Sequence, residues 1–141
     1  MKNVQAQFQM LDSYVKEYNL KTKEKILKQD DLNVKGKIGF CIINISEEES
    51  LIGEIELTND LDILVKNQIK AQIRIVMRGL FKYADKNEKE KFETMLKING
   101  AATLSNLMRA YIHTNTALSG MPNIIIPMIN FVEFFKNVEK Q

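Results

Sequence analysis

Residues 69–83 read Ile-Lys-Ala-Gln-Ile-Arg-Ile-Val-Met-Arg-Gly-Leu-Phe-Lys-Tyr, and this stretch decides the fold. Its odd-numbered positions are apolar or small, whereas its even-numbered positions are mostly polar or charged. Neighbouring side chains of a β-strand point to opposite faces, so this alternation predicts a long strand with one apolar and one mostly polar face.

The segment before this strand has the same pattern. Residues 51–65 place leucine, isoleucine and valine on one face and acidic residues and threonine on the other. Asn67 and Gln68 suit a tight connection, so the two segments are predicted to form a β-hairpin.

A third strand is predicted before this hairpin. Apolar residues alternate from Ile38 to Ile42, and the apolar positions then shift to Ile43 and Ile45. A change of face within one strand is typical of a β-bulge, which we expect near residues 42–43.

The first part of the chain predicts a fourth strand. Residues 8–25 alternate less regularly, but Tyr14, Tyr18 and Leu20 fall on one face. Residues 30–36 are polar and are expected to connect this strand to the next.

The second half of the chain has helical spacing. Residues 85–97 form a charge-rich helix, which Asn99 and Gly100 are expected to end. A longer helix is predicted to follow and to be capped by Gly120; its apolar residues at helical spacing are Ala101, Leu104, Met108, Tyr111 and Leu118. Small residues on neighbouring faces indicate that this helix packs closely against a partner helix; they are Gly100, Thr103, Ala110, Thr114 and Ala117.

Large apolar residues and two prolines mark the end of the chain. Residues 121–130 cannot form a regular helix because Pro122 and Pro127 lack the backbone N–H. Residues 131–140 are predicted to close the chain as a helix with a phenylalanine-rich stripe. Two interpretations of residues 121–135 stay open: a loop that packs over the core, or the apolar wall of a groove.

The order of these elements defines the fold class. Four strands followed by helices predict an α+β fold, in which a four-stranded antiparallel sheet precedes a long helix, a proline-containing loop and a C-terminal helix. The chain has 141 residues, and residues 1–141 are expected to form a single domain.

No set of residues for catalysis or cofactor binding is found. His113 is the one histidine, so a zinc site with about three or four ligands is not expected. Cys41 is the one cysteine, and its apolar neighbours predict a small buried side chain in preference to a reactive thiol. The sequence therefore predicts no enzyme, no metal site and no cofactor.

The charges are nearly balanced. Twenty Lys and Arg residues face eighteen Asp and Glu residues, giving a net charge of +2, which disfavours a nucleic-acid partner. One competing hypothesis remains, a basic strand face that binds a small ligand or nucleic acid; its residues would be Lys35, Lys37, Lys70, Arg74 and Arg78.

The apolar stretches bear on cellular location. Residues 1–10 are polar, and the longest apolar stretches, residues 38–45 and 121–129, are far shorter than the roughly 20 residues that span a bilayer. We therefore expect a cytoplasmic protein without direct membrane insertion.

Three motifs, taken in order, resemble the SecB family of bacterial export chaperones. The strongest lies in the last third of the chain, where Arg109, Gly120, Pro122, Ile124–Ile126, Pro127, Asn130 and Phe131 follow the family order. The others are Gly79-Leu80-Phe81 together with residues 95–100, and the first-strand segment Tyr14–Leu20. The resemblance covers roughly residues 8–135 and identifies the chain as a divergent, SecB-like member.

This resemblance implies an ATP-independent holdase that keeps unfolded or secretory polypeptides competent for translocation. Members form a dimer of dimers, bind client chains in hydrophobic grooves and pass preproteins to the SecA motor. The residues that the resemblance points to for client binding are Ile38, Phe40, Ile42, Met121, Ile124, Ile126, Phe131, Phe134 and Phe135. Those that it points to for the oligomer interface are Leu104, Leu107, Met108 and Tyr111.

The chain departs from the family at the acidic face on which SecA docks. Glu17 keeps one acid, but Lys21 and Arg74 stand where the family has acids. Two charge reversals on one docking face should repel the partner that an acidic face attracts. The alternative is therefore a SecB-like chaperone dedicated to one client, such as the antitoxin of a toxin–antitoxin pair, without delivery to SecA.

Overall fold

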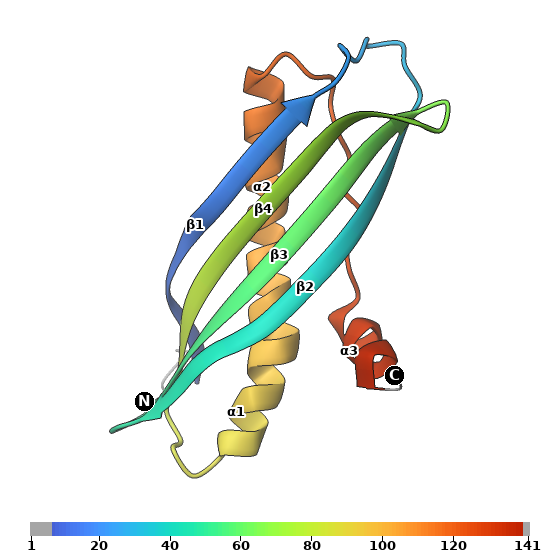
Figure 1. Cartoon of the computed structure of the whole chain (residues 1–141). Helices are drawn as coiled ribbons and strands as arrows, with labels where there is room; N and C mark the ends of the chain where they lie inside the picture. Colours follow the sequence, from blue (N-terminus) through green and yellow to red (C-terminus); the bar gives the residue numbers. More distant parts are fainter. Residues whose placement is uncertain (1–6, 140–141) are drawn as a thin grey trace, which may run out of the picture.

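The computed structural model describes residues 7–139, which form one antiparallel sheet with helices on a single face (Figure 1). The strands lie in the spatial order β1-β4-β3-β2; they are β1 (Phe8–Thr22), β2 (Leu32–Glu47), β3 (Leu51–Val65) and β4 (Gln68–Tyr83). The helices are α1 (Lys89–Met95), a π-helical turn η1 (Leu96–Gly100), α2 (Ala101–Leu118) and α3 (Phe131–Glu139). The predicted α+β fold, with its four strands, long helix and C-terminal helix, is confirmed.

The β3–β4 hairpin forms the centre of the sheet. Its inner face is apolar and buried, and its turn consists of Lys66 and Asn67, whose φ angles are 52° and 64°. Two successive positive φ angles are those of a type I′ turn, whose twist matches that of the strands. The predicted turn at Asn67 and Gln68 is one residue too late, because Gln68 already pairs with Val65.

The bulge predicted in β2 is confirmed, since its register with β3 shifts between Ile42 and Asn44. A similar shift in β1 lies between Val15 and Glu17. A bulge inserts one residue and so exchanges the two faces beyond it. Tyr14 is therefore 49% exposed, whereas Tyr18 packs against the core, and the prediction that Tyr14 shares the face of Tyr18 is wrong.

The connector between β1 and β2 starts and ends earlier than predicted. β1 ends at Thr22 instead of Lys25, and β2 begins at Leu32, because Leu32 and Val34 already pack against the core. Within the connector, the Asp30 carboxylate accepts a hydrogen bond of 2.7 Å from the backbone N–H of Leu27.

The helical layer does not break at Asn99 and Gly100, so this prediction is wrong. Gly100 has helical φ and ψ angles of −64° and −49°, and α1, η1 and α2 follow one another without interruption. A Cβ atom on Gly100 would lie 2.9 Å from Ile55 Cδ1, and one on Gly53 would lie 2.7 Å from Leu96 Cδ1. Packing against the sheet thus overrides the low helix propensity of glycine.

The buried stripe of α2 repeats every four residues through Leu104, Met108, Ile112 and Thr116. Leu118, which has the same helical spacing in the sequence, is 82% exposed and lies outside this buried stripe. The helix ends as predicted at Gly120, whose φ of 79° is followed by a hydrogen bond from Met121 N–H to Thr116 C=O.

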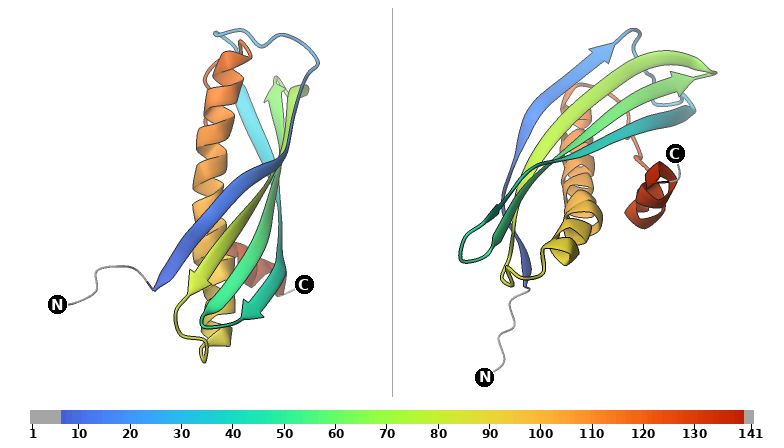
Figure 2. Two further views of the ribbon diagram at one scale, coloured as in Figure 1. Left: turned by 90° about the vertical axis from the view of Figure 1, so that its left-hand side faces the viewer. Right: turned by 60° about the horizontal axis from the view of Figure 1, so that its bottom comes forward.

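The rest of the inner face is covered by residues 119–130, which we call the proline loop, and by α3. This loop runs from the end of α2 back along the β2 side of the sheet to α3 (Figure 1), and Figure 2 shows α2 along the same face. Arg109 Nε donates a 3.1 Å hydrogen bond to Ile126 C=O and so ties α2 to the loop. None of the helices in residues 7–139 is long and apolar enough to cross a membrane.

Candidate functional site

A surface groove with a volume of about 650 Å³ lies between β2 and the proline loop. We call it the loop groove. Leu32 and Val34 at the start of β2 form one wall, and the other comes from Met121, Ile125 and the two prolines of the loop. Lys28, Asp30 and Asn123 provide its polar side chains. The groove is therefore mainly apolar, with a polar edge at the connector.

Two further depressions extend this site. One, of about 340 Å³, lies between connector residues 25–29 and residues 120–122. The other, of about 440 Å³, lies on the α2 side of the loop and is lined by Arg109, His113 and Ile125, among others. Ile125 thus stands between the loop groove and the depression beside α2.

The proline loop exposes large apolar side chains. Ile125 is 78% exposed and Met128 is 74% exposed, whereas Ile124 and Ile126 are 4% and 5% exposed. Because an extended segment alternates its side chains, anchoring Ile124 and Ile126 in the core turns Ile125 toward solvent. The buried residues fix the position of the exposed ones.

A phenylalanine cluster anchors α3 beside β2. The Phe40 and Phe135 ring centroids lie 5.0 Å apart in an edge-to-face arrangement, and Phe134 and Phe135 lie 5.0 Å apart in the same way. Phe131 is 4% exposed and contacts both other rings of α3. Edge-to-face aromatic pairs add specificity to apolar burial, so the cluster sets where α3 closes the site.

The predicted client-binding residues fall into two groups. Ile124, Ile126 and Phe131 are buried in the core of the chain and offer almost no surface, which corrects their expected place on a groove wall. The partly buried members of the predicted set pack against the same core and keep some surface; they are Ile38, Phe40, Ile42, Met121, Phe134 and Phe135. Their role in client binding stays a prediction.

The sequence reasoning missed the most exposed residues of the site. Ile125 is not among the residues expected to bind clients, and Leu32 and Val34 fall within the segment predicted as a polar connector. The alternation of an extended segment between two prolines was the available signal for Ile125. No local pattern shows that the β1–β2 connector lies against the loop.

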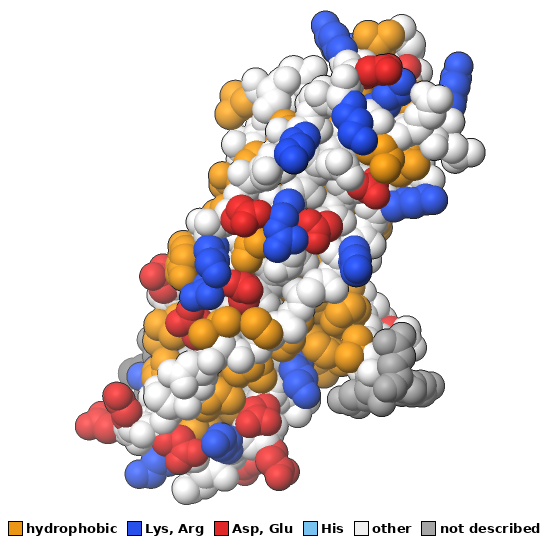
Figure 3. Space-filling model, in the orientation of Figure 1, with side chains coloured by type: hydrophobic (Ala, Val, Ile, Leu, Met, Phe, Trp, Pro, Cys, Tyr) orange, Lys and Arg blue, Asp and Glu red, His pale blue; other side chains and the backbone are white. Residues whose placement is uncertain are grey.

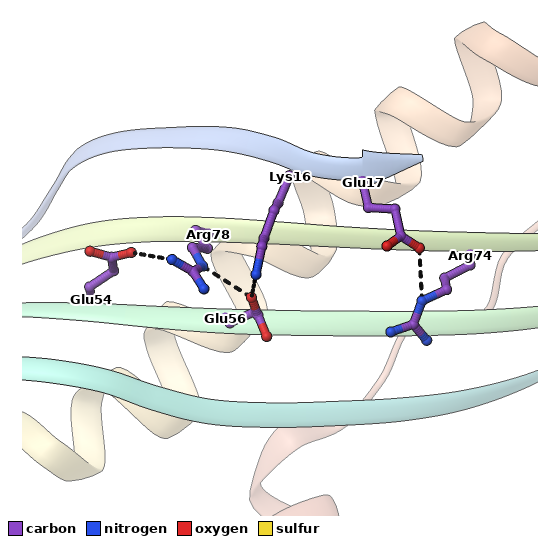
Figure 4. Close-up of polar contacts among 6 residues, drawn as sticks. All are labelled: Lys16, Glu17, Glu54, Glu56, Arg74 and Arg78. Atoms are coloured by element: carbon purple, nitrogen blue, oxygen red, sulfur yellow. Dashed lines mark hydrogen bonds and ion pairs between the residues drawn. The ribbon is translucent and has the colours of Figure 1, made fainter. Parts of the chain in front are cut away.

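The outer face of the sheet, which no helix covers, carries a network of ion pairs (Figures 3 and 4). Arg74 bridges Glu17 and Asp60 with N–O distances of 2.9 Å each. The residues drawn in Figure 4 come from β1, β3 and β4; they are Lys16, Glu17, Glu54, Glu56, Arg74 and Arg78.

Glu56 lies at the centre of this network. Its carboxylate is 3.0 Å from Arg78 Nε and 3.2 Å from Lys16 Nζ. Partial burial alone would raise the pKa of Glu56, but the hydrogen bonds from Arg78 and Lys16 lower it overall. The pKa of Arg74 is raised, first by its hydrogen bonds to Asp60 and then by the charges of Asp60 and Glu17.

The three residues predicted for an altered SecA-docking face lie close together. Glu17 and Arg74 form an ion pair, and Lys21 lines a shallow depression with Asp60 and Arg74. Arg74 therefore does more than reverse one charge, because it also occupies the carboxylates of two neighbours. The same ion pairs occupy Arg74 and Arg78 of the competing basic-face hypothesis.

The predicted oligomer-interface residues also divide. Leu104 and Met108 are 0% and 1% exposed and pack against the sheet, so they offer no surface to a second chain, which corrects their expected place at the oligomer interface. Leu107 is 36% exposed, and the partly exposed Tyr111 ring packs edge-on against Tyr18 with a centroid distance of 5.1 Å. Only these two keep surface that a second chain can contact.

Cys41 is exposed on the outer face of β2, which corrects its predicted burial. Phe40 and Ile42 point inward, so the residue between them points out. Within residues 7–139, no cluster of three or more His, Cys, Asp or Glu side chains is arranged to hold a metal ion.

No protein-family model matches the sequence, and no curated protein matches it. The four-stranded sheet with its long helix, loop and terminal helix has the SecB-like fold. A similar solved structure is that of Mycobacterium tuberculosis Rv1957, a SecB-like chaperone in complex with a ChAD peptide from the Rv1956 HigA1 antitoxin. The TM-score is 0.68 at 13% identity, over 86% of this chain and 90% of that chain.

Proposed function

We propose that this chain is a chaperone that holds unfolded polypeptide segments in the loop groove without using ATP. The observation that carries the proposal is the exposure of Ile125 in an apolar groove of about 650 Å³, on a loop that also exposes Met128. Exposed apolar surface of this kind marks sites for apolar partners. Burying it against an unfolded chain contributes roughly 25 cal/mol per Å² and needs no specific sequence.

The fold supports the same proposal. A SecB-like fold is found in Rv1957, which is described as a chaperone and was solved with a peptide bound. In this chain the matching loop and C-terminal helix are held by buried anchors, so the groove is formed before a client arrives. A preformed groove lowers the entropy cost of binding.

A chaperone dedicated to one client is the second candidate, and the outer face of the sheet favours it over delivery to SecA. Arg74 engages the carboxylates of Glu17 and Asp60, so few acidic groups are free to attract a basic partner. The peptide bound to Rv1957 comes from an antitoxin. In this second candidate function, the single client of the chain is likewise an antitoxin.

The assembly in this proposal is a cytoplasmic homo-oligomer, a dimer of dimers. Leu107 and Leu118 leave exposed apolar surface along α2, where a second copy would pack. Light scattering of the purified chain tests the assembly, and a monomer at micromolar concentration would contradict it.

Suppression of aggregation tests the general function. A chemically denatured protein is diluted into buffer with and without the chain, in the absence of ATP, and turbidity is followed. The proposal predicts suppression at stoichiometric amounts of chaperone. Undiminished turbidity at every ratio would contradict it.

The second candidate, a chaperone dedicated to one antitoxin, is tested by the neighbourhood of its gene and by competition between clients. If the gene lies beside a toxin–antitoxin pair, that antitoxin should displace a generic unfolded client from the groove. If the generic client and the antitoxin bind equally well, the general function stands and the dedicated one fails.

A further inference from the structure

The charged groups around the proline loop are mostly cations without acidic partners. Lys25 and Lys28 are exposed and line the groove and its extension, and neither is in an ion pair within residues 7–138. Arg109, on the α2 side of Ile125, donates to the Ile126 carbonyl and has no carboxylate partner in the same range. His113 lines the same depression.

Acidic groups near the groove are fewer and partly engaged. Asp30 is the one carboxylate among the side chains that line the loop groove, and it already accepts the backbone N–H of Leu27. Glu24 is paired with Lys70 on β4. Asp31 is exposed beside the connector but does not line the groove.

At the centre of the outer face of the sheet, in contrast, the two arginines of β4 are paired with carboxylates. Glu56 is held there by two cations at once. In Figure 3 the end of this face near the connector and the β3–β4 hairpin carries mainly Lys and Arg. The outer face also has exposed lysines outside any ion pair within residues 7–138, such as Lys21, Lys35 and Lys37, but these do not line the apolar groove, whereas Lys28 does.

From this arrangement we infer that the loop groove selects client segments in which apolar residues are flanked by Asp or Glu. The inference rests on the proposed function and specifies the class of client. Apolar side chains of an extended segment would pack on Ile125 and the β2 wall, and the flanking carboxylates would face Lys25, Lys28 and Arg109. Lysine-flanked segments would meet like charges, which disfavour binding.

The size of the preference follows from the exposure of these cations. Each exposed charge pair contributes little, but several together act on one bound segment. An acid-flanked peptide is expected to bind about tenfold more tightly than its lysine-flanked counterpart at low salt. The difference should shrink to about twofold near 0.5 M salt, because screening is strong there.

Three fluorescent peptides test the inference by anisotropy with the full chain. They share one apolar sequence and differ only in flanks of glutamate, serine or lysine. The double variant Lys25→Glu with Lys28→Glu should weaken binding of the glutamate-flanked peptide by about tenfold and tighten binding of the lysine-flanked one. The matched control is Lys86→Glu with Lys91→Glu, which makes the same charge change at exposed positions near α1.

Each result decides between the claims, with circular dichroism confirming that every variant is folded. Equal binding of the three peptides would overturn the charge preference and leave the proposed function standing. Absence of binding by all three, serine-flanked peptide included, would overturn both. A short single-stranded oligonucleotide that binds as tightly as the glutamate-flanked peptide, and displaces it, would also overturn the inference by assigning the cations to nucleic acid.

Discussion

The two surfaces of this molecule use the same residue types in opposite ways. On the outer face of the sheet, Arg74 and Arg78 are tied to carboxylates on neighbouring strands. Lys28 in the loop groove and Arg109 in the depression beside α2 lie near the exposed Ile125 and have no acidic partner within residues 7–138. The arginines of the first surface are already paired, whereas the second surface has both apolar and charged groups available for a partner.

This difference shows why the net charge of +2 says little about partners. Some of the charges that cancel in the total are paired with each other on the outer face, whereas cations such as Lys28 stand beside the groove without an ion pair. A surface whose charges are already paired offers little gain to a second molecule, since binding must first break those pairs. At the groove, a partner has no such ion pairs of Lys28 to break, so binding there avoids this cost.

The largest effect is expected from removing an anchor of the groove. Phe131→Ala leaves a cavity where a 4% exposed ring meets Phe134 and Phe135. The free energy of unfolding should fall by about 3–5 kcal/mol, as measured by urea denaturation. Val132→Ala, at a neighbouring residue that is 43% exposed, is the control and should change stability by less than about 0.5 kcal/mol. Equal losses in both variants would mean that α3 is not anchored in this way.

The next effect separates binding from stability. Replacing Ile125 and Met128 together by aspartate removes two exposed apolar side chains from the proline loop, of which Ile125 lines the groove. Affinity for a serine-flanked apolar peptide should fall by about tenfold or more, with an unchanged denaturation midpoint. Thr58→Asp places a new charge on the outer face and should leave the affinity unchanged. A similar loss of affinity in the Thr58 variant would show that the outer face takes part in binding.

A smaller effect is expected from the outer network. Arg74→Ala breaks the bridges to Glu17 and Asp60, but these groups are solvent-accessible and water replaces the lost contacts. The loss of stability should be clearly smaller than in Phe131→Ala, and peptide affinity should be unchanged. If the chain binds SecA at all, freeing the two carboxylates should increase that binding, as measured by sedimentation. A decrease would contradict the view that Arg74 blocks this face.

The smallest effect concerns pH. Because the folded-state pKa of Glu56 is lowered from its ordinary value of 4.5, its ion pairs stabilise the fold above that value. This stabilisation is lost as the pH falls through the lower folded-state pKa. Glu56→Gln should therefore be less stable than the parent chain at neutral pH, and the difference should vanish in acid. Glu48→Gln, at an exposed residue outside any ion pair within residues 7–138, is the matched control and should leave stability at neutral pH nearly unchanged. A difference that persists in acid would assign the effect of Glu56 to packing.

The sheet was predictable from sequence because apolar and polar residues alternate along a strand that has one buried face. The same rule located the bulge near Ile42, where apolar residues stand next to each other. It missed the bulge after Val15, because polar residues there leave no visible change of face. The helix break expected at Gly100 failed for a different reason: a glycine needed for close approach to Ile55 looks, in sequence, the same as one that ends a helix.

The candidate site was predictable only in part. The proline loop and the phenylalanines were recognisable as an unusual apolar segment, but the sequence did not show which of Ile124, Ile125 and Ile126 would be exposed. That depends on contacts with α2, such as the hydrogen bond from Arg109 to Ile126. The cations near the groove come from a connector distant in sequence, so only the folded structure brings them to the site.

Site-specific photo-crosslinking tests the central claim, that unfolded chains bind in the loop groove. A benzophenone amino acid is placed at Ile125 in one variant and at Thr58, on the outer face, in another, and each is irradiated with a denatured client. The account predicts strong crosslinks from position 125, competed by an apolar peptide, and weak ones from position 58. Equal crosslinking at both positions, or stronger crosslinking at position 58, would contradict it.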